Sequence, residues 1–181
     1  MVAAVLGACS GEGGEGAPSP TATTTASATV TPSPTPTPAP SRPAAMARGD
    51  VEGAEAAARY FLSLYPYAYS TGDLEEWIAL SDPECVFCAS VVDDVRELHD
   101  DGGYETGGAI VFEGGTGSDP IAGNAYFGVD LVVNQDGSTR FDENGRVVSQ
   151  SDGGRFVMSL ALTPANGQWL VRGVSYEEST Q

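Results

Sequence analysis

The sequence predicts an α+β domain in which three N-terminal helices pack on a curved antiparallel sheet of four to six strands. Three observations support this prediction. Between residues 51 and 101, apolar residues recur with the period of an amphipathic helix. Beyond residue 108 they alternate, as in a half-buried strand. Clusters of Gly, Asn and Asp separate the alternating runs, as turns do. Helices followed by consecutive strands favour a sheet that is covered on one face.

The first helix is expected from residue 51 to Gly72. Its apolar face includes Ala54, Phe61 and Leu64, which are spaced by three or seven residues. Pro66 interrupts the pattern, because proline removes a backbone donor and clashes with the preceding turn. We therefore expect a kink, or a second short helical piece that ends at Gly72.

Two shorter helices are expected next. Segment 73–81 turns Leu74, Trp77 and Ile78 toward the core, and Thr71 or Asp73 caps it. Segment 88–101 forms the third helix, with an apolar seam that starts at Cys88, and the glycine pair at 102 and 103 ends it.

Five β-rich runs follow the helices. Each is bounded by turn residues, and the dipeptides Asn144-Gly145 and Asn166-Gly167 predict hairpin turns. In the fourth run, Phe156 and Met158 share one face with two leucines. The runs cover residues 109–115, 125–135, 139–150, 154–164 and 167–178.

Residues 10–50 are interpreted as a tether, and the α+β domain is assigned to 51–178. Eight of the twelve prolines lie between residues 17 and 43, among Ser, Thr and Ala. No apolar periodicity offsets the entropy of ordering such a segment, so it is expected to be disordered with polyproline II character. At about 3.1 Å per residue, the tether would reach on the order of 120 Å. Unmodified linker and O-glycosylated stalk both remain open.

Residues 1–9 resemble the end of a lipoprotein signal. Leu6 to Cys9 read "LGAC", which is similar to the bacterial lipobox, where the cysteine is lipidated and becomes the new N-terminus. Two or more acyl chains give lasting anchoring, at about 0.8 kcal/mol per buried CH₂. The apolar run is short and the first basic residue is Arg42, so we expect the signal to begin upstream of Met1. A chance run of small residues is the alternative.

The charge of the chain limits its partners. The formal net charge is −17, and all eight basic residues are arginine. Binding to nucleic acid needs clustered basic residues, so no nucleic-acid partner is expected. Attraction to an anionic membrane by charge is equally disfavoured. Membrane attachment is therefore expected through the lipid at Cys9, on the extracytoplasmic face of the cell membrane.

Two further resemblances follow from these motifs. The order of helices, "STGD" turn and long antiparallel sheet is similar to the cone-shaped fold of the nuclear-transport-factor-2-like superfamily, which includes SnoaL-like proteins. The stretches "YPYAYSTGDLEEWIALSDPECVFC" and "DDGGYETGG" resemble an actinobacterial lipoprotein family known as domain of unknown function 6318. That resemblance covers roughly residues 51–178. It implies a fold, a cellular address and a role for a cysteine pair, but no activity.

Cys85 and Cys88 allow three interpretations. A zinc site would need two more ligands, and the domain offers only the distant His99, which we expect at the surface. A redox pair is favoured by a position at a helix N-terminus, but Asp82 and Glu84 oppose a thiolate and no strand precedes the motif. A structural disulfide agrees with the oxidising compartment of an exported protein. We favour the disulfide and expect no metal or cofactor.

Two functional hypotheses remain. The favoured one is a noncatalytic, lipid-anchored domain that binds a small ligand or an envelope protein. The resemblance to the superfamily also allows a homodimer formed through the open sheet. The alternative is a SnoaL-like enzyme acting on a hydrophobic small molecule, with Asp130 as general base, although we favour an exposed strand position as the explanation of Asp130. Five aromatic residues are candidates to line a cavity, or else belong to the core: Tyr65, Tyr69, Trp77, Tyr104 and Tyr126.

Overall fold

The long first helix begins and ends where the sequence predicts. The computed structural model describes residues 37–179, and in it α1 spans Val51–Thr71. The Asp50 carboxylate accepts a hydrogen bond from the Gly53 amide (3.1 Å), which caps the first turn. Gly72 ends the helix in the left-handed conformation. The helix continues through Pro66 in one piece, because buried side chains on both sides of the proline hold it against the rest of the domain.

Two shorter helices follow, α2 (Glu75–Leu80) and α3 (Val86–Asp100). The Asp73 carboxylate accepts a hydrogen bond from the Glu75 amide (3.0 Å) at the start of α2. The prediction that Ile78 faces inward is wrong, since its side chain is 45% exposed and Leu80 is buried instead. With fewer than two turns, α2 has no long periodic pattern from which to read its inner face.

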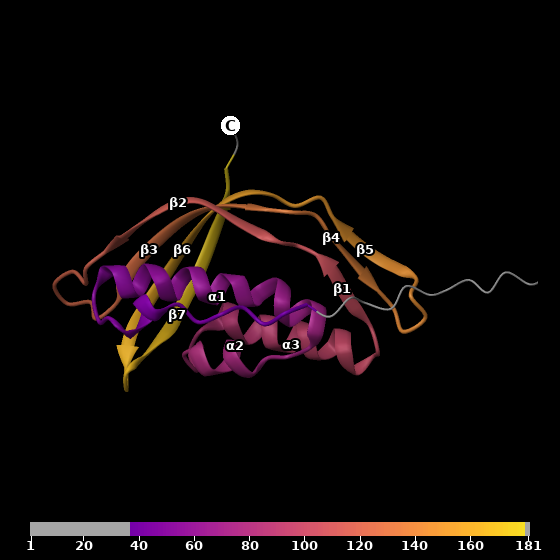
Figure 1. Ribbon diagram of the computed structural model, residues 1–181, viewed down its shortest axis with the longest axis horizontal. Coiled ribbons are helices and arrows are strands. Elements are labelled where there is room, and N and C mark those ends of the chain that lie inside the picture. Colours follow the sequence, from indigo (N-terminus) through magenta and orange to yellow (C-terminus); the bar gives the residue numbers. More distant parts are fainter. Residues whose placement is uncertain (1–36, 180–181) are drawn as a thin grey trace, which may run out of the picture. The chain divides into compact units, whose positions relative to one another are not determined.

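The strands form two antiparallel sheets. One has four strands in the order β2-β3-β6-β7, and the other has three in the order β1-β4-β5. Helices lie against the four-stranded sheet on one side; in Figure 1, α1 lies below β2, and β6 and β7 extend down past it. The strands are β1 (Tyr104–Gly107), β2 (Ile110–Ser118), β3 (Phe127–Gln135), β4 (Ser138–Phe141), β5 (Val147–Ser151), β6 (Gly154–Ala165) and β7 (Gln168–Glu178). The predicted α+β class is therefore confirmed. The single curved sheet is divided in two, and β1 was not predicted.

Gly107, Gly137 and Gly153 lie where the two sheets meet, at a site here called the glycine corner. The chain crosses from one sheet to the other three times, between β1 and β2, between β3 and β4, and between β5 and β6 (Figure 1). Gly107 and Gly153 adopt positive φ at two of these crossings. A Cβ atom at Gly107 would lie 2.4 Å from the Gly137 carbonyl oxygen, and one at Gly153 would lie 2.2 Å from the Gln135 carbonyl oxygen. Only glycine allows the backbones to come this close.

The core lies between the helices and the inner face of the four-stranded sheet. Phe61 of α1 and Trp77 of α2 stack with ring centroids 4.0 Å apart. Alternate residues of β3 and β6 meet them from the sheet, because successive strand side chains point to opposite faces. The buried sheet residues are Phe127, Val129, Leu131, Val133, Leu160, Leu162, Trp169 and Val171. The predicted hairpin at Asn166-Gly167 is confirmed between β6 and β7, with positive φ at both residues.

The folded part extends further toward the N-terminus than the expected boundary at residue 51. Residues Ala44–Ala47 form a short 3₁₀ helix, η1, and Met46 is buried in the core. The Trp169 indole N–H donates to the Met46 carbonyl (3.0 Å) and the Arg48 carbonyl (3.2 Å). The last residues of the predicted 10–50 tether therefore pack on β7. The predicted lipidation site Cys9 and residues 10–36 lie outside the described residues.

Candidate functional site

An apolar cavity of about 230 Å³ lies between α1 and the ends of the strands of the four-stranded sheet. Its walls come from α1, the start of α3 and all four strands of the sheet. Figure 1 shows these strands converging above the middle of α1. Eight of the nine lining residues are apolar or aromatic, and none is charged. The lining residues are Leu62, Tyr65, Phe87, Ile110, Val133, Gln135, Phe156, Met158 and Tyr176.

Strand register brings the sheet side of this cavity together. Val133 of β3 pairs with Phe156 of β6, and Met158 of β6 pairs with Tyr176 of β7. These positions alternate with outward-facing ones, so their side chains point to the same face of the sheet. The rings of Phe156 and Tyr176 meet edge to face, with centroids 6.1 Å apart. The wall is thus aromatic toward the C-terminal end of β7.

Gln135 is the one side chain of the wall that carries a carboxamide. It ends β3, pairs with Ile110 of β2 and lies next to the glycine corner. Among the described residues, no hydrogen bond joins its carboxamide to another group, and no buried side-chain polar atom is left without a partner. Gln135 therefore lines the cavity with a carboxamide that is not buried away from solvent.

Tyr65 contributes its ring to the wall. Burial is the main cause that raises its pKa, and the neighbouring Tyr69 side chain acts in the opposite direction. The two rings lie 4.7 Å apart between centroids. Tyr65 therefore stays protonated near neutral pH.

Phe87 enters the wall from the first turn of α3, which a disulfide braces. Cys85 and Cys88 form the disulfide, and only Val86 and Phe87 lie between them. Both cysteines are 1% exposed, and the Trp77 indole N–H donates to the Cys88 carbonyl (3.1 Å). The disulfide is thus built into the core, and it restrains the residue that forms one side of the cavity.

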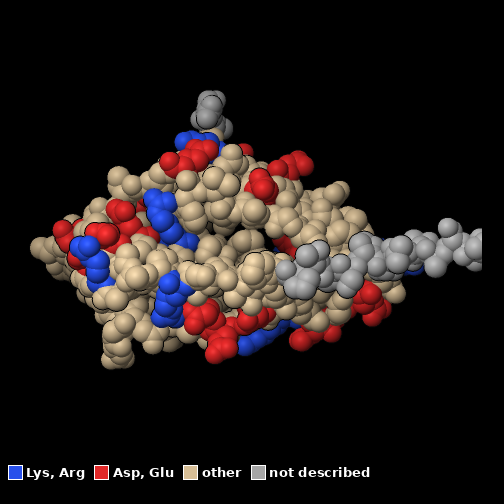
Figure 2. Space-filling view, viewed as in Figure 1, with Lys and Arg blue, Asp and Glu red and all other residues tan. Residues whose placement is uncertain are grey.

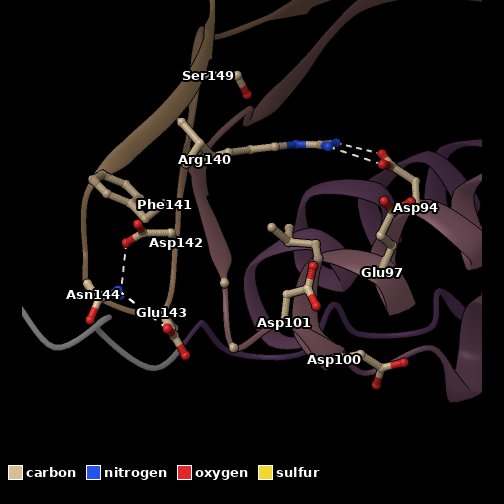
Figure 3. A pocket seen from close by; sticks show the side chains of 14 residues that line it. Asp94, Glu97, Asp100, Asp101, Arg140, Phe141, Asp142, Glu143, Asn144 and Ser149 are labelled. Carbon is tan, nitrogen blue, oxygen red and sulfur yellow. Dashed lines mark hydrogen bonds and ion pairs between the residues drawn. The ribbon is translucent and has the colours of Figure 1, made fainter.

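A cluster of charged residues links α1 and α3 to the three-stranded sheet. Arg140 of β4 donates to both oxygens of Asp94 on α3 (3.1 and 2.6 Å) and to Glu105 of β1 (2.6 Å). Figure 3 shows the Arg140 side chain extended across to Asp94. The Tyr69 hydroxyl donates to the same carboxylate (2.6 Å), and Arg140 lies over the Tyr69 ring at 5.0 Å. Four side chains from four elements therefore form one network.

The network shifts the ionisation of its members. Hydrogen bonds from Arg140 are the main cause that lowers the pKa of Asp94. The hydrogen bond to Asp94 is the main cause that raises the pKa of Arg140. Burial, followed by the hydrogen bond to Asp94, raises the pKa of Tyr69. Each shift favours the state that the ion pair requires, namely a charged pair beside a neutral phenol.

An open groove of about 850 Å³ lies beside this network. Its walls carry six carboxylates, and Arg140 is the only basic side chain among them. The groove runs between the end of α3 and the β4–β5 hairpin, which face each other in Figure 3. Within residues 37–179, no group of three or more His, Cys, Asp or Glu side chains is arranged to hold a metal ion.

Of the five aromatic residues predicted to line a cavity, only Tyr65 does so. Tyr69 and Trp77 are buried in the core. Tyr104 stacks on Phe141 at 4.9 Å, and the Tyr126 hydroxyl accepts a hydrogen bond from Arg172 (3.3 Å). The other aromatic wall residues, Phe87, Phe156 and Tyr176, were not named as candidates, because their convergence depends on strand register.

Asp130 lies away from the cavity. It is exposed on the outer face of β3, where it accepts a hydrogen bond from the Ser159 hydroxyl (2.6 Å). The outer position follows from alternation, since Val129 and Leu131 on either side are buried. His99, expected at the surface, is partly buried and its ring lies 3.1 Å from the Tyr69 carbonyl oxygen.

Most of the chain matches one known protein family. The family DUF6318, described as a family of unknown function, matches residues 23–175. The chain belongs to DUF6318. No curated protein matches the DUF6318 chain.

Solved structures show the fold of this DUF6318 member. The intermembrane-space region of chloroplast protein ARC6 matches with a TM-score of 0.55 and 12% identity, over 73% of this chain and 99% of that one. A putative scytalone dehydratase from Novosphingobium aromaticivorans has 14% identity and a TM-score of 0.37, over 68% and 83%. An uncharacterised protein with a cystatin-like fold from Caulobacter vibrioides has 13% identity and a TM-score of 0.39, over 68% and 88%. The domain therefore shares its overall α+β fold with the ARC6 region.

Proposed function

We propose that this DUF6318 protein is an exported, lipid-anchored protein whose domain binds a small uncharged ligand in the apolar cavity without converting it. The cavity is the observation that carries the proposal. Aromatic and aliphatic side chains line most of it, as is usual for small-molecule sites. No carboxylate or imidazole belongs to its walls, so the lining offers a site for binding rather than for proton transfer.

Two features support the proposed location outside the cytoplasm. The "LGAC" sequence at Leu6 to Cys9 and the Pro-, Ser- and Thr-rich segment after it suit a lipid-anchored spacer. The Cys85–Cys88 disulfide suits an oxidising compartment, where such bonds persist. No helix of the described residues is long and apolar enough to cross a membrane, and the proposed anchor is the lipid on Cys9.

The enzymatic alternative relies on Asp130 as a base. That carboxylate is on the outer face of the sheet, whereas the cavity lies on the inner face. A substrate in the cavity would be separated from Asp130 by the sheet itself. The geometry therefore favours binding over catalysis by this residue.

The intact mass of the protein from membranes of its native host tests the location. A mass that begins at Cys9 with added acyl chains is expected, with Cys85 and Cys88 alkylated only after reduction. A Cys9→Ala variant should lose the lipid mass and leave the membrane fraction. An unlipidated Cys9 in the native protein would contradict the anchor, and free thiols at residues 85 and 88 would contradict the oxidising location.

A further inference from the structure

The size of the cavity limits the ligand. Apolar protein cavities of about 150 Å³ hold one benzene molecule, whereas sites for drug-sized ligands usually exceed about 300 Å³. The 230 Å³ cavity lies between these values. It therefore suits a molecule with one or two rings.

The walls favour a neutral aromatic ligand. Four of the nine lining residues are aromatic, and flat ligands pack well against such rings. No charged side chain lines the cavity, so a charged ligand would lose its hydration without a partner. Glu177 and Glu178 directly follow Tyr176 at the end of β7, and their negative charge disfavours an anion further. Uncharged side chains also dominate the central band of the face shown in Figure 2.

The wall has one carboxamide, that of Gln135, which is able to specify the ligand. The Gln135 carboxamide has a carbonyl acceptor and an NH₂ donor, and neither bonds to another described residue. An entirely apolar ligand would cover this amide and leave it without a hydrogen-bond partner, which weakens binding. A ligand with a donor or acceptor at its edge would satisfy it.

We propose that the cavity binds a neutral aromatic molecule of one or two rings, and that Gln135 recognises a single hydrogen-bonding group on its edge. This inference rests on the proposed binding function and names the class of ligand. Gln135 is then the residue that determines specificity, and the aromatic walls supply the remaining contacts.

Indole and indene form a matched pair of probes, because they have nearly the same shape and only indole carries an N–H donor. We would titrate the folded domain with each and follow the shifts of cavity methyl and aromatic signals by NMR. The native protein should bind indole about fivefold more tightly than indene, as expected for one neutral hydrogen bond. In Gln135→Met the ratio should fall to about one, through weaker indole binding. Asn134→Met, at the adjacent outward-facing position, should leave the ratio unchanged.

A second pair of variants tests the location of binding. Ile110→Trp fills the cavity and should abolish binding of both probes, whereas Val111→Trp, whose native side chain is 58% exposed on the other face, should not. Indole-3-acetate, which is anionic, should not bind. Should Ile110→Trp fail to fold, the probe-induced shifts of Met158 and Ile110 in the native domain locate the site.

These experiments distinguish a failure of the role of Gln135 from a failure of ligand binding in the cavity. Equal affinities for indole and indene in the native domain would overturn the role of Gln135 and leave the cavity as a binding site. A ratio that survives Gln135→Met would do the same. Failure of both probes to bind would overturn the ligand class and the binding function together.

Discussion

The two ends of the domain close against the helices in opposite ways. At the four-stranded sheet the contact is apolar, and it leaves the cavity next to Tyr65. At the three-stranded sheet the contact is the network of Arg140, Asp94, Glu105 and Tyr69. Tyr65 and Tyr69, one turn apart on α1, belong to the two different environments. One helix therefore contributes a residue to the cavity wall and another to the ion-pair network.

This difference has a physical reason. The four-stranded sheet is broad enough for several rows of inward side chains, so apolar burial stabilises it. The β1 and β4 strands have only four residues each, and all five residues of β5 are exposed. A small sheet of this kind buries little apolar area. Directional hydrogen bonds from one arginine therefore hold it to α3.

Removal of Arg140 should have the largest effect on stability. Arg140→Ala would leave the Glu105 carboxylate, whose side chain is 10% exposed, without its cationic partner. We expect a loss of about 3 kcal/mol in the free energy of unfolding, measured by urea titration. Arg48→Ala is the matched control, since its partners are about half exposed, and it should cost less than about 1 kcal/mol. Equal losses in the two variants would contradict the structural role of the network.

Removal of the disulfide should have the next largest effect, at the other end. Cys85→Ala combined with Cys88→Ala should lower the free energy of unfolding by about 2 kcal/mol, because the short loop is no longer constrained in the unfolded chain. Indole binding should also weaken, because Phe87 loses the closure that places it in the wall.

A reductant provides the control for this prediction. It should lower the stability of the native protein and leave that of the double variant unchanged. If a reductant that cleaves the bond changes neither stability nor binding, the disulfide has no role in the wall.

Acid should have a smaller effect on stability, and this effect should come from the Asp94–Arg140 ion pair at one end of the domain and not from the cavity at the other end. The pKa of Asp94 is lowered in the folded state by Arg140, so its stabilising contribution is complete above the pKa of the unfolded chain. It should decline as the pH falls through about 4 toward the lower, folded-state pKa. In urea midpoints measured from about pH 7 to about pH 3, Asp94→Asn should show a weaker acid-dependent loss than the native protein. Gln135→Met should keep the native profile, and an identical profile for Asp94→Asn would refute the assignment.

The smallest effect is expected at Asp130. Asp130→Asn keeps an acceptor for the Ser159 hydroxyl on the exposed face of β3. Stability should change by less than about 0.5 kcal/mol, and indole binding should be unchanged. Circular dichroism melting and the NMR titration measure the two. Loss of binding in this variant would connect the outer face to the cavity and restore Asp130 as a functional residue.

Local patterns predicted much of the fold. The helical spacing of Ala54, Phe61 and Leu64 located α1, and Asn166-Gly167 located the last hairpin. The interior of α1 is continuous through Pro66, because burial of the flanking turns outweighs the local cost of proline. Ile78 was misplaced, since one and a half turns of helix contain too few apolar positions to define a face.

The candidate site was predicted only in part. Tyr65 was named as a wall residue, and Phe156 and Met158 were placed on one strand face. Gln135 has no local signal, because it is an ordinary polar residue at a strand end. Its significance appears only when the glycine corner and the strand register bring it to the same cavity as Tyr65 and Phe87.

By itself, the sequence determined the α+β class, the order of the three helices and of the strands after β1, and the alternation of apolar and polar residues along the strands. These features depend on the period of neighbouring residues, which is a local property of the chain. The tertiary structure decided the division into two sheets, the Arg140 network and the cavity. Those features join residues from distant segments, such as Asp94 and Arg140 or Leu62 and Tyr176. Their contacts depend on how the chain turns at the glycine corner, and no local period encodes that geometry.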